Sequence, residues 1–361
     1  MIEDIIGGIV EAVGDVVFDA ASRKVKNVKH DKSVKKAASV LKDGGLVAFP
    51  TETVYGLGAD AFNASAVAKI YEAKGRPSDN PLILHIAKAE QLFELADAVP
   101  GYANALIDNF WPGALTLIVK KKLDLPGWVG GHPHNHTHTI GVRIPSHPVA
   151  LAFLKAAECP VAAPSANKSG RPSPTTIKHV KDDFAATGEI NYILDGDDSE
   201  IGIESTVVDV TGDAPVILRP GAITREMIQN ATGLSLGEAS KTNTLRSPGV
   251  KYRHYAPQAP MTILSGTPDS IAAYMLEDAD SHIGLLISSE TKKLLGSQKK
   301  SNVIILSDNP DEIAQSLFAN LRKFDKLGVT KIYVQAIPDT GIGVAIMDRM
   351  LKAAEGRIIN V

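Results

Sequence analysis

The chain has 361 residues, 44% hydrophobic and 22% charged, a composition typical of a globular protein with roughly two domains. The formal net charge of −3 excludes a strongly basic nucleic-acid-binding protein, so contact with nucleic acid would need a local basic patch. One cysteine excludes an internal disulfide and a cysteine-rich metal site, and it fits the cytoplasm in which we expect the protein.

Residues 1–32 form a leader with apolar residues at helical spacing and an acidic start. A secretory signal peptide would begin with basic residues, so we expect an amphipathic helix docked on the body or on another subunit. Attachment to a membrane surface is the alternative, although such helices usually carry lysine and arginine on the polar face. No apolar run reaches the roughly 18 residues of a membrane span.

Residues 33–233 alternate short apolar strands with helices, which predicts a single α/β domain. Ser33 is expected to cap the first helix, which ends at a pair of glycines. A buried strand follows at residues 46–49, and residues 91–98 and 102–110 are predicted helices.

Two polar segments of this domain are candidate parts of a binding site. Residues 50–58, with the sequence PTETVYGLG, place hydroxyls, a carboxylate and a phenol directly after a buried strand. Residues 74–81, KGRPSDNP, cannot continue a helix, so Lys74, Arg76 and Asn80 are expected on a fixed loop. Cations held in this way suit a phosphate. The alternative for residues 50–58 is a tight turn, and the alternative for residues 74–81 is a solvated surface loop.

Histidines occur in two further settings. His85 lies within the predicted strand 81–86, where a satisfied core residue and a ligand contact are both open. Residues 120–139 carry four alternate histidines between positions 132 and 138. We expect a mobile surface insertion there, and chelation of a transition metal is the alternative.

Four cations, Lys74, Arg76, Arg143 and Arg219, are predicted beside strand ends of the first domain. Four positive charges are more than a substrate with one carboxylate needs, and they match the negative charge of a triphosphate. No Walker A sequence is present, and Ser165 lacks both a G-x-S-x-G elbow and a histidine partner. The chemistry supported best is electrostatic: to hold a nucleotide, align an attacking oxygen and neutralise departing pyrophosphate.

Residues 234–258 have the composition of a linker, but their last part, KYRHYAP at 251–257, is too aromatic and basic for a spacer. We expect this segment to cover the ligand as a lid. Residues 259–361 alternate strands and helices, which predicts a small Rossmann-like domain with an open parallel sheet.

Seven motifs in order resemble those of the YrdC family. They are FPTETVYGLG at 49–58, KGRP at 74–77, NPL at 80–82, VRIP at 142–145, PSAN at 164–167, ESTV at 204–207 and RPG at 219–221. With the KYRHYAP segment and the C-terminal domain, roughly residues 33–361 resemble the two-domain threonylcarbamoyl-AMP synthases. The resemblance implies a twisted mixed sheet in the first domain.

The resemblance also implies an activity. Such enzymes are nucleotidyltransferases that convert L-threonine, bicarbonate or CO2 and ATP, with Mg2+, into threonylcarbamoyl-AMP and pyrophosphate. Other proteins then take over the product for the threonylcarbamoyladenosine modification of tRNA. An RNA-binding module and a related carbamoyl-adenylate enzyme with another acceptor remain alternatives, and direct tRNA binding stays open.

Carried onto this chain, the resemblance assigns three sets of residues. The catalytic set is Lys74, Arg76, Ser165 and Asn167. The threonine pocket is Thr53, His85, Arg143, Ala163 and Ser205. The nucleotide site is Arg76, Asn80, Thr139, Ser165, Ser173, Arg219, His254 and Tyr255. The guanidinium of Arg143 would hold the amino-acid carboxylate in a fork geometry that a lysine cannot copy.

Overall fold

The computed structural model describes residues 32–184, 188–239, 254–278, 280, 282–296 and 302–361. Residues 1–31 of the leader and the first three residues of the KYRHYAP segment lie outside these residues.

The elements before residue 240 are α2 (Lys32–Lys42), β1 (Val47–Phe49), β2 (Gly56–Asp60), α3 (Ala64–Lys74), β3 (Ile83–His85), α4 (Glu90–Leu95), β4 (Ala96–Ala98), α5 (Gly101–Phe110), β5 (Leu115–Lys121), β6 (Thr139–Arg143), α6 (Pro148–Ala157), β7 (Val161–Ala163), α7 (Ile177–Phe184), β8 (Tyr192–Ile193), β9 (Thr206–Asp209), β10 (Val216–Arg219) and α8 (Arg225–Thr232). The later elements are β11 (Met261–Ser265), α10 (Pro268–Glu277), β12 (Gly284–Ile287), α11 (Ser289–Leu295), β13 (Asn302–Ile305), α12 (Pro310–Leu327), β14 (Ile332–Gln335), α13 (Gly343–Ala353) and β15 (Ile358–Asn360).

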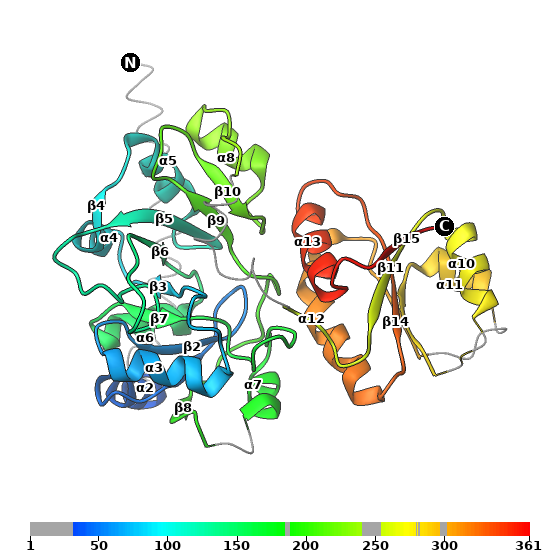
Figure 1. Cartoon of the computed structure of the whole chain (residues 1–361), viewed down its shortest axis with the longest axis horizontal. Coiled ribbons are helices and arrows are strands. Elements are labelled where there is room, and N and C mark those ends of the chain that lie inside the picture. Colours follow the sequence, from blue (N-terminus) through cyan, green and yellow to red (C-terminus); the bar gives the residue numbers. More distant parts are fainter. Residues whose placement is uncertain (1–31, 185–187, 240–253, 279, 281, 297–301) are drawn as a thin grey trace.

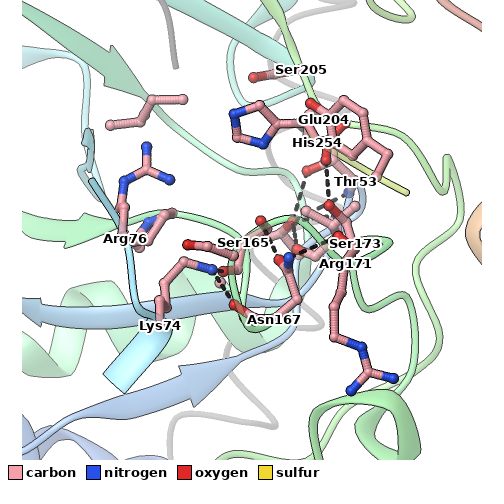
Figure 2. A pocket seen from close by; sticks show the side chains of 18 of the residues that line it. Thr53, Lys74, Arg76, Ser165, Asn167, Arg171, Ser173, Glu204, Ser205 and His254 are labelled. Carbon is pink, nitrogen blue, oxygen red and sulfur yellow. Dashed lines mark hydrogen bonds between the residues drawn. The ribbon is translucent and has the colours of Figure 1, made fainter. Parts of the chain in front are cut away.

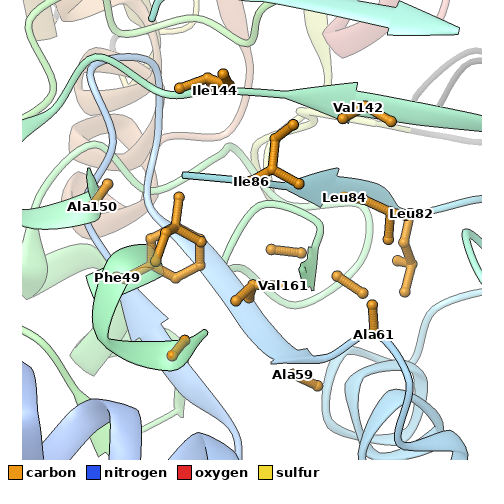
Figure 3. Packing of buried hydrophobic residues seen from close by; sticks show 14 of the residues in the cluster. Phe49, Ala59, Ala61, Leu82, Leu84, Ile86, Val142, Ile144, Ala150 and Val161 are labelled. Carbon is orange, nitrogen blue, oxygen red and sulfur yellow. The ribbon is translucent and has the colours of Figure 1, made fainter. Parts of the chain in front are cut away.

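The strands before residue 240 form one mixed sheet in the order β10-β9-β5-β6-β3-β7-β2-β1-β8, and β4 pairs with β5 (Figure 1). Parallel pairs such as β3–β6 and β5–β9 alternate with antiparallel pairs such as β2–β7 and β5–β6. Its strands bury apolar side chains such as Phe49, Leu84 and Val142 in one core (Figure 3). The predicted mixed α/β domain is confirmed.

The strands after residue 260 form a second sheet in the order β13-β12-β14-β11-β15. Every pair described in it is parallel. Helices α12 and α13 lie on the side that faces the first sheet, whereas α10 and α11 lie on the far side (Figure 1). The predicted Rossmann-like parallel domain is therefore confirmed.

Apolar and charged contacts join the two units. Val54, Ile203 and Tyr255 belong to the same buried cluster as Phe318 of α12. Gly202, which has a φ of +79°, lies so close to α12 that an added Cβ would stand 2.4 Å from the Cα of Gln315. Only glycine fits such an approach of two backbones. The interface is thus part of the fold of both units.

Several local expectations need correction. Residues 96–98 form strand β4 instead of the end of a helix, because they pair with Lys120 and Lys121 of β5. Ser33 lies inside α2, which already includes Lys32, so it is not the residue before the helix.

Within the described parts of the chain, no helix is long and apolar enough to cross a membrane.

The histidine-rich segment is better anchored than a mobile insertion would be. Lys121 Nζ donates hydrogen bonds to the carbonyl oxygens of Pro126 and Gly127, and the ring of His132 packs edge-on against Tyr71 at 4.8 Å. Among the described residues, no group of three or more histidine, cysteine or acidic side chains is arranged to hold a metal ion.

Candidate active site

A cavity opens at the strand ends of the first sheet, with an empty volume of about 730 Å3 including its mouth. Figure 2 shows Lys74 and Arg76 on one side of the cavity and Ser173, Glu204 and His254 on the other. The cavity therefore collects polar groups from segments far apart in the sequence.

The end of α3 places the first two cations. Asn63 caps the start of this helix by accepting a hydrogen bond from the backbone N–H of Ala66, and Gly75 ends it in the left-handed conformation at φ 60°. The glycine turns the chain directly after Lys74, so that Arg76 lies on the following loop. Arg76 is held there by donating to the carbonyl oxygens of Asn80 (3.2 Å) and Pro81 (2.7 Å).

The loop after β7 surrounds the buried ammonium of Lys74. Lys74 Nζ donates to the carbonyl oxygens of Ser165 (2.5 Å) and Asn167. Ser165 Oγ donates to Asn167 Oδ1 at 2.6 Å, and Asn167 Nδ2 donates to the carbonyl oxygen of Arg171 at 2.9 Å. Burial, with Arg76 beside it, lowers the pKa of Lys74 well below its usual value. An anion bound here would supply the negative charge that favours the charged ammonium.

Arg143, at the end of β6, marks a second part of the cavity. Its Nη2 donates to Glu52 Oε1 at 2.6 Å, its Nη1 to Thr53 Oγ1 at 2.8 Å and its Nε to the carbonyl oxygen of Gly113 at 3.1 Å. His85 on the neighbouring strand β3 has a buried Nδ1 without a hydrogen-bond partner. Burial, followed by the charge of Arg143, lowers the pKa of His85 to about 3, so the ring is neutral at physiological pH.

Arg219, at the end of β10, forms a third part of the cavity. Its Nε donates to the carbonyl oxygen of Ser205 at 3.1 Å, and its Nη2 lies 3.3 Å from Ser205 Oγ. Ser173 Oγ donates to Glu204 Oε1 at 2.5 Å. Burial disfavours the carboxylate, but Arg349 and Arg219 outweigh this effect and hold the pKa of Glu204 below its usual value.

His254 and Tyr255 bring the end of the KYRHYAP segment to the cavity. Tyr255 has a positive φ of 63° and stacks on the ring of Phe318 of α12 at 5.2 Å. The next residue, Ala256, donates its N–H to the carbonyl oxygen of Gly170 at 2.9 Å. The Nε2 of His254 is buried without a hydrogen-bond partner, and burial lowers the pKa of His254 to about 3.

Most of the residues assigned from the sequence line this one cavity. They are Thr53, Lys74, Arg76, His85, Arg143, Ala163, Ser165, Asn167, Ser173, Ser205, Arg219, His254 and Tyr255. Asn80 lies behind Arg76, where its Nδ2 is buried without a partner.

Thr139 differs from the expectation. It begins β6, four residues before Arg143, and it lines a separate surface depression with Lys120 and His138. A strand rises about 3.3 Å per residue, so these two side chains are separated by roughly 13 Å along β6. The structure therefore places Thr139 outside the cavity that holds the other nucleotide-site residues.

The sequence-based assignment gives no role to two residues with defined contacts. Glu204 occurs there only within the ESTV motif, yet it lines the cavity. Arg349 of α13 reaches the Glu204 carboxylate from the second unit, with Nε 2.9 Å from Oε2. One sequence signal was present: Arg349 shares an apolar helix face with Ala345 and Ala353, where a charged residue needs a partner.

Four cations and several hydroxyls converge from a helix end, strand ends and loops, and no nucleophile–base pair is evident among the groups described above. A mixed sheet with such a cavity defines an α/β enzyme that binds a phosphate-rich substrate and acts through electrostatics and positioning.

Comparisons with known proteins agree with this class. The model of the Sua5–YciO–YrdC family, described as telomere recombination, matches residues 39–221, and that described as threonylcarbamoyl-AMP synthase, C-terminal domain, matches residues 223–355. The chain is 44% identical to the threonylcarbamoyl-AMP synthase of Bacillus subtilis, over 92% of this chain and 95% of that protein. It is 43% identical to that of Pyrococcus abyssi, over 91% and 96%.

A solved structure of P. abyssi Sua5 complexed with L-threonine superimposes with a TM-score of 0.81 at 42% identity. It covers 91% of this chain and 96% of that one. The protein belongs to the family of two-domain threonylcarbamoyl-AMP synthases.

Proposed function

We propose that this protein is an L-threonylcarbamoyl-AMP synthase that uses L-threonine, bicarbonate or CO2 and ATP, and releases pyrophosphate. The observation that carries the proposal is the convergence of Lys74, Arg76, Arg143 and Arg219 on one cavity. Three of these cations suit the phosphates of ATP. The fourth, Arg143, lies beside the neutral His85 and the hydroxyl of Thr53, a setting suited to an amino acid.

The proposed reaction uses few groups of the protein. The amine of threonine attacks CO2 and loses a proton, which gives a carbamate. A carbamate oxygen then attacks the α-phosphorus of ATP, and the bond to the departing pyrophosphate breaks. Arg143 orients the threonine carboxylate, whereas Lys74, Arg76 and Arg219 stabilise the charge of the phosphates. Ser165 and Asn167 keep the Lys74 ammonium in place through their carbonyl oxygens.

Mg2+ would enter with ATP as part of the substrate. Glu204 is the acidic side chain among the lining residues, and both of its carboxylate oxygens already accept hydrogen bonds, from Ser173 and Arg349. A cavity of this kind suits an ion held by phosphates and water, as Mg2+ usually is, better than an ion held in a protein cage. The ion would screen the phosphates during the attack.

We further propose that the reaction takes place in the cytoplasm and serves the threonylcarbamoyladenosine modification of tRNA. A mixed anhydride such as threonylcarbamoyl-AMP hydrolyses readily in water, so a transient hand-over to the transfer machinery would protect it.

The test measures pyrophosphate release by the purified full-length chain with MgATP. Release that requires both threonine and bicarbonate, with threonylcarbamoyl-AMP identified by mass spectrometry, is the expected result. Release that ignores threonine would sink the proposal. Turnover with carbamoyl phosphate but not with threonine would indicate the related carbamoyl-adenylate enzyme. Tight, steeply salt-dependent binding of tRNA without binding of ATP would indicate the RNA-binding module.

A further inference from the structure

Arg349 of α13 is the largest fully buried side chain among the described residues. Its Nη1 donates to Asp348 of its own unit at 2.5 Å, and its other nitrogens bond the first unit. Its Nε donates to Glu204 Oε2 at 2.9 Å, and its Nη2 donates to the carbonyl oxygens of Pro220 (3.0 Å) and Glu204 (3.3 Å). Glu204 precedes Ser205, and Pro220 follows Arg219. One side chain of the second unit therefore holds two loops of the first, each next to a residue of the cavity.

The contacts continue from Arg349 into the cavity. The second oxygen of the Glu204 carboxylate, Oε1, accepts a hydrogen bond from Ser173 Oγ at 2.5 Å. Glu204 and Ser173 line the cavity, whereas Arg349 lies behind them in the wall. Without Arg349, the carboxylate of Glu204 would face a bound polyanion without its closest positive charge, and like charges at short range repel strongly in a buried site.

We propose that Arg349 is a positioning residue for the nucleotide end of the cavity. Through the carboxylate of Glu204 it orients the hydroxyl of Ser173. Through the carbonyl oxygen of Pro220 it fixes the segment next to Arg219. It also cancels the charge of Glu204, so that triphosphate can approach. This inference rests on the proposed function for the identity of the ligand. The second domain is accordingly part of the active-site wall.

A positioning role predicts a selective effect. Of the groups assigned to threonine, Thr53 and Arg143 are held by partners such as Glu52 and the carbonyl of Gly113. Ser205 alone among these groups directly follows Glu204, which Arg349 bonds. Loss of Arg349 should therefore weaken ATP far more than threonine. A purely structural role in the interface would instead lower the melting temperature without favouring one ligand over the other.

Arg322 of α12 offers a matched control. It is also buried and also bonds the first unit from the second, with Nη1 and Nη2 at 3.0 and 2.7 Å from the two carboxylate oxygens of Asp183. Asp183 does not line the cavity, although it pairs with the lining residue Arg171 at 2.9 Å, and Arg322 Nη2 also donates to the carbonyl oxygen of Pro172, next to Ser173. Arg322→Met thus removes a buried interdomain ion pair whose carboxylate lies outside the cavity, whereas Arg349→Met removes the one whose carboxylate lines it.

The experiment compares these two variants with Arg349→Lys and the double variant Glu204→Gln/Arg349→Met. Calorimetry gives the Kd of ATP and of threonine, and thermal melts give the Tm. We expect Arg349→Met to raise the Kd of ATP on the order of 100-fold, the size of effect seen when one partner of a buried charge pair is removed at a binding site. The Kd of threonine should rise much less, by at most about tenfold, because Ser205 is the threonine-pocket residue that adjoins Glu204. Arg349→Lys should retain part of the affinity, and the double variant should regain most of it because no unpaired charge remains.

The inference is overturned if Arg349→Met lowers the Tm but leaves the Kd of ATP unchanged. It is also overturned if Arg322→Met weakens ATP as much, or if ATP and threonine weaken equally. Should the wild-type chain bind ATP but release pyrophosphate without threonine, the proposed function fails. The comparison of ATP affinities would still decide the role of Arg349.

Discussion

The ion pair between Arg143 and Glu52 should connect stability with recognition of threonine. Both side chains are 4% exposed, and the guanidinium nitrogen lies 2.6 Å from Glu52 Oε1. The other oxygen of that carboxylate, Oε2, is buried without a partner. Replacing Arg143 with methionine therefore leaves a buried carboxylate with no positive charge beside it, the situation in which loss of one partner is most costly.

Breaking such a pair typically costs about 3–5 kcal/mol. A domain of about 200 residues loses roughly 2–4 °C of Tm per kcal/mol, so Arg143→Met should lower the Tm by about 10 °C. The variant should also bind threonine about 100-fold more weakly, because a charge-assisted contact with the carboxylate is worth roughly 3 kcal/mol.

Circular dichroism melts without ligand and calorimetry with threonine measure the two effects separately. The double variant Glu52→Gln/Arg143→Met is the control: a neutral amide should restore most of the Tm, whereas threonine affinity should stay low. If the single variant melts like the wild type, Glu52 is not a buried charge held by Arg143 and the reasoning fails. If the double variant regains threonine affinity, Arg143 does not contact the substrate.

Three further predictions concern other parts of the cavity. Because burial holds the pKa of His85 at about 3, the unfolded chain binds a proton more readily, and stability should fall as pH drops from about 6.5 towards 3, by about 2 kcal/mol at pH 5. Melts of His85→Gln between pH 5 and 7 should lack this part of the pH dependence, and curves parallel to the wild type would contradict it. Gly221→Ala would place a Cβ 2.3 Å from the backbone nitrogen of Thr206. The free energy of unfolding, measured with denaturant, should therefore fall by about 1–3 kcal/mol. An unchanged denaturation midpoint would rule out this contact. Tyr255→Ala removes the stacking contact with Phe318 and should weaken ATP and threonine binding about tenfold if this segment acts as a lid; unchanged affinities and turnover would end that idea.

The sequence predicted the parts of the site that lie on local signals. Glycine and proline after the helix that ends at Lys74 indicated the fixed loop of Arg76, and the PSAN motif at 164–167 indicated a role for Ser165 through the resemblance. The residues alone could not decide whether His85 is a core residue or a ligand contact, because both settings place histidine on an apolar strand. The structure pairs His85 with Arg143 on the neighbouring strand and leaves its Nδ1 buried without a partner, which favours a ligand contact.

Features that depend on distant pairing were harder to predict. Residues 96–98 have helical neighbours, but pairing with β5 overrides that local preference. The position of Thr139 depends on how far β6 extends before Arg143. The VRIP motif at 142–145 does not indicate where this strand begins. The bond from Arg349 to Glu204 joins positions 145 residues apart, and no local pattern links them.

The place of Arg349 near the end of the chain has a consequence for synthesis on the ribosome. The first domain emerges well before α13 has been translated, so the nascent chain holds Glu204 without the cation that neutralises it. A ribosome that stalls in the last helix would release a protein with all seven motifs of the first domain but an unfinished nucleotide site. If Arg349 positions the nucleotide end as proposed, such a chain would bind ATP more weakly than the full chain.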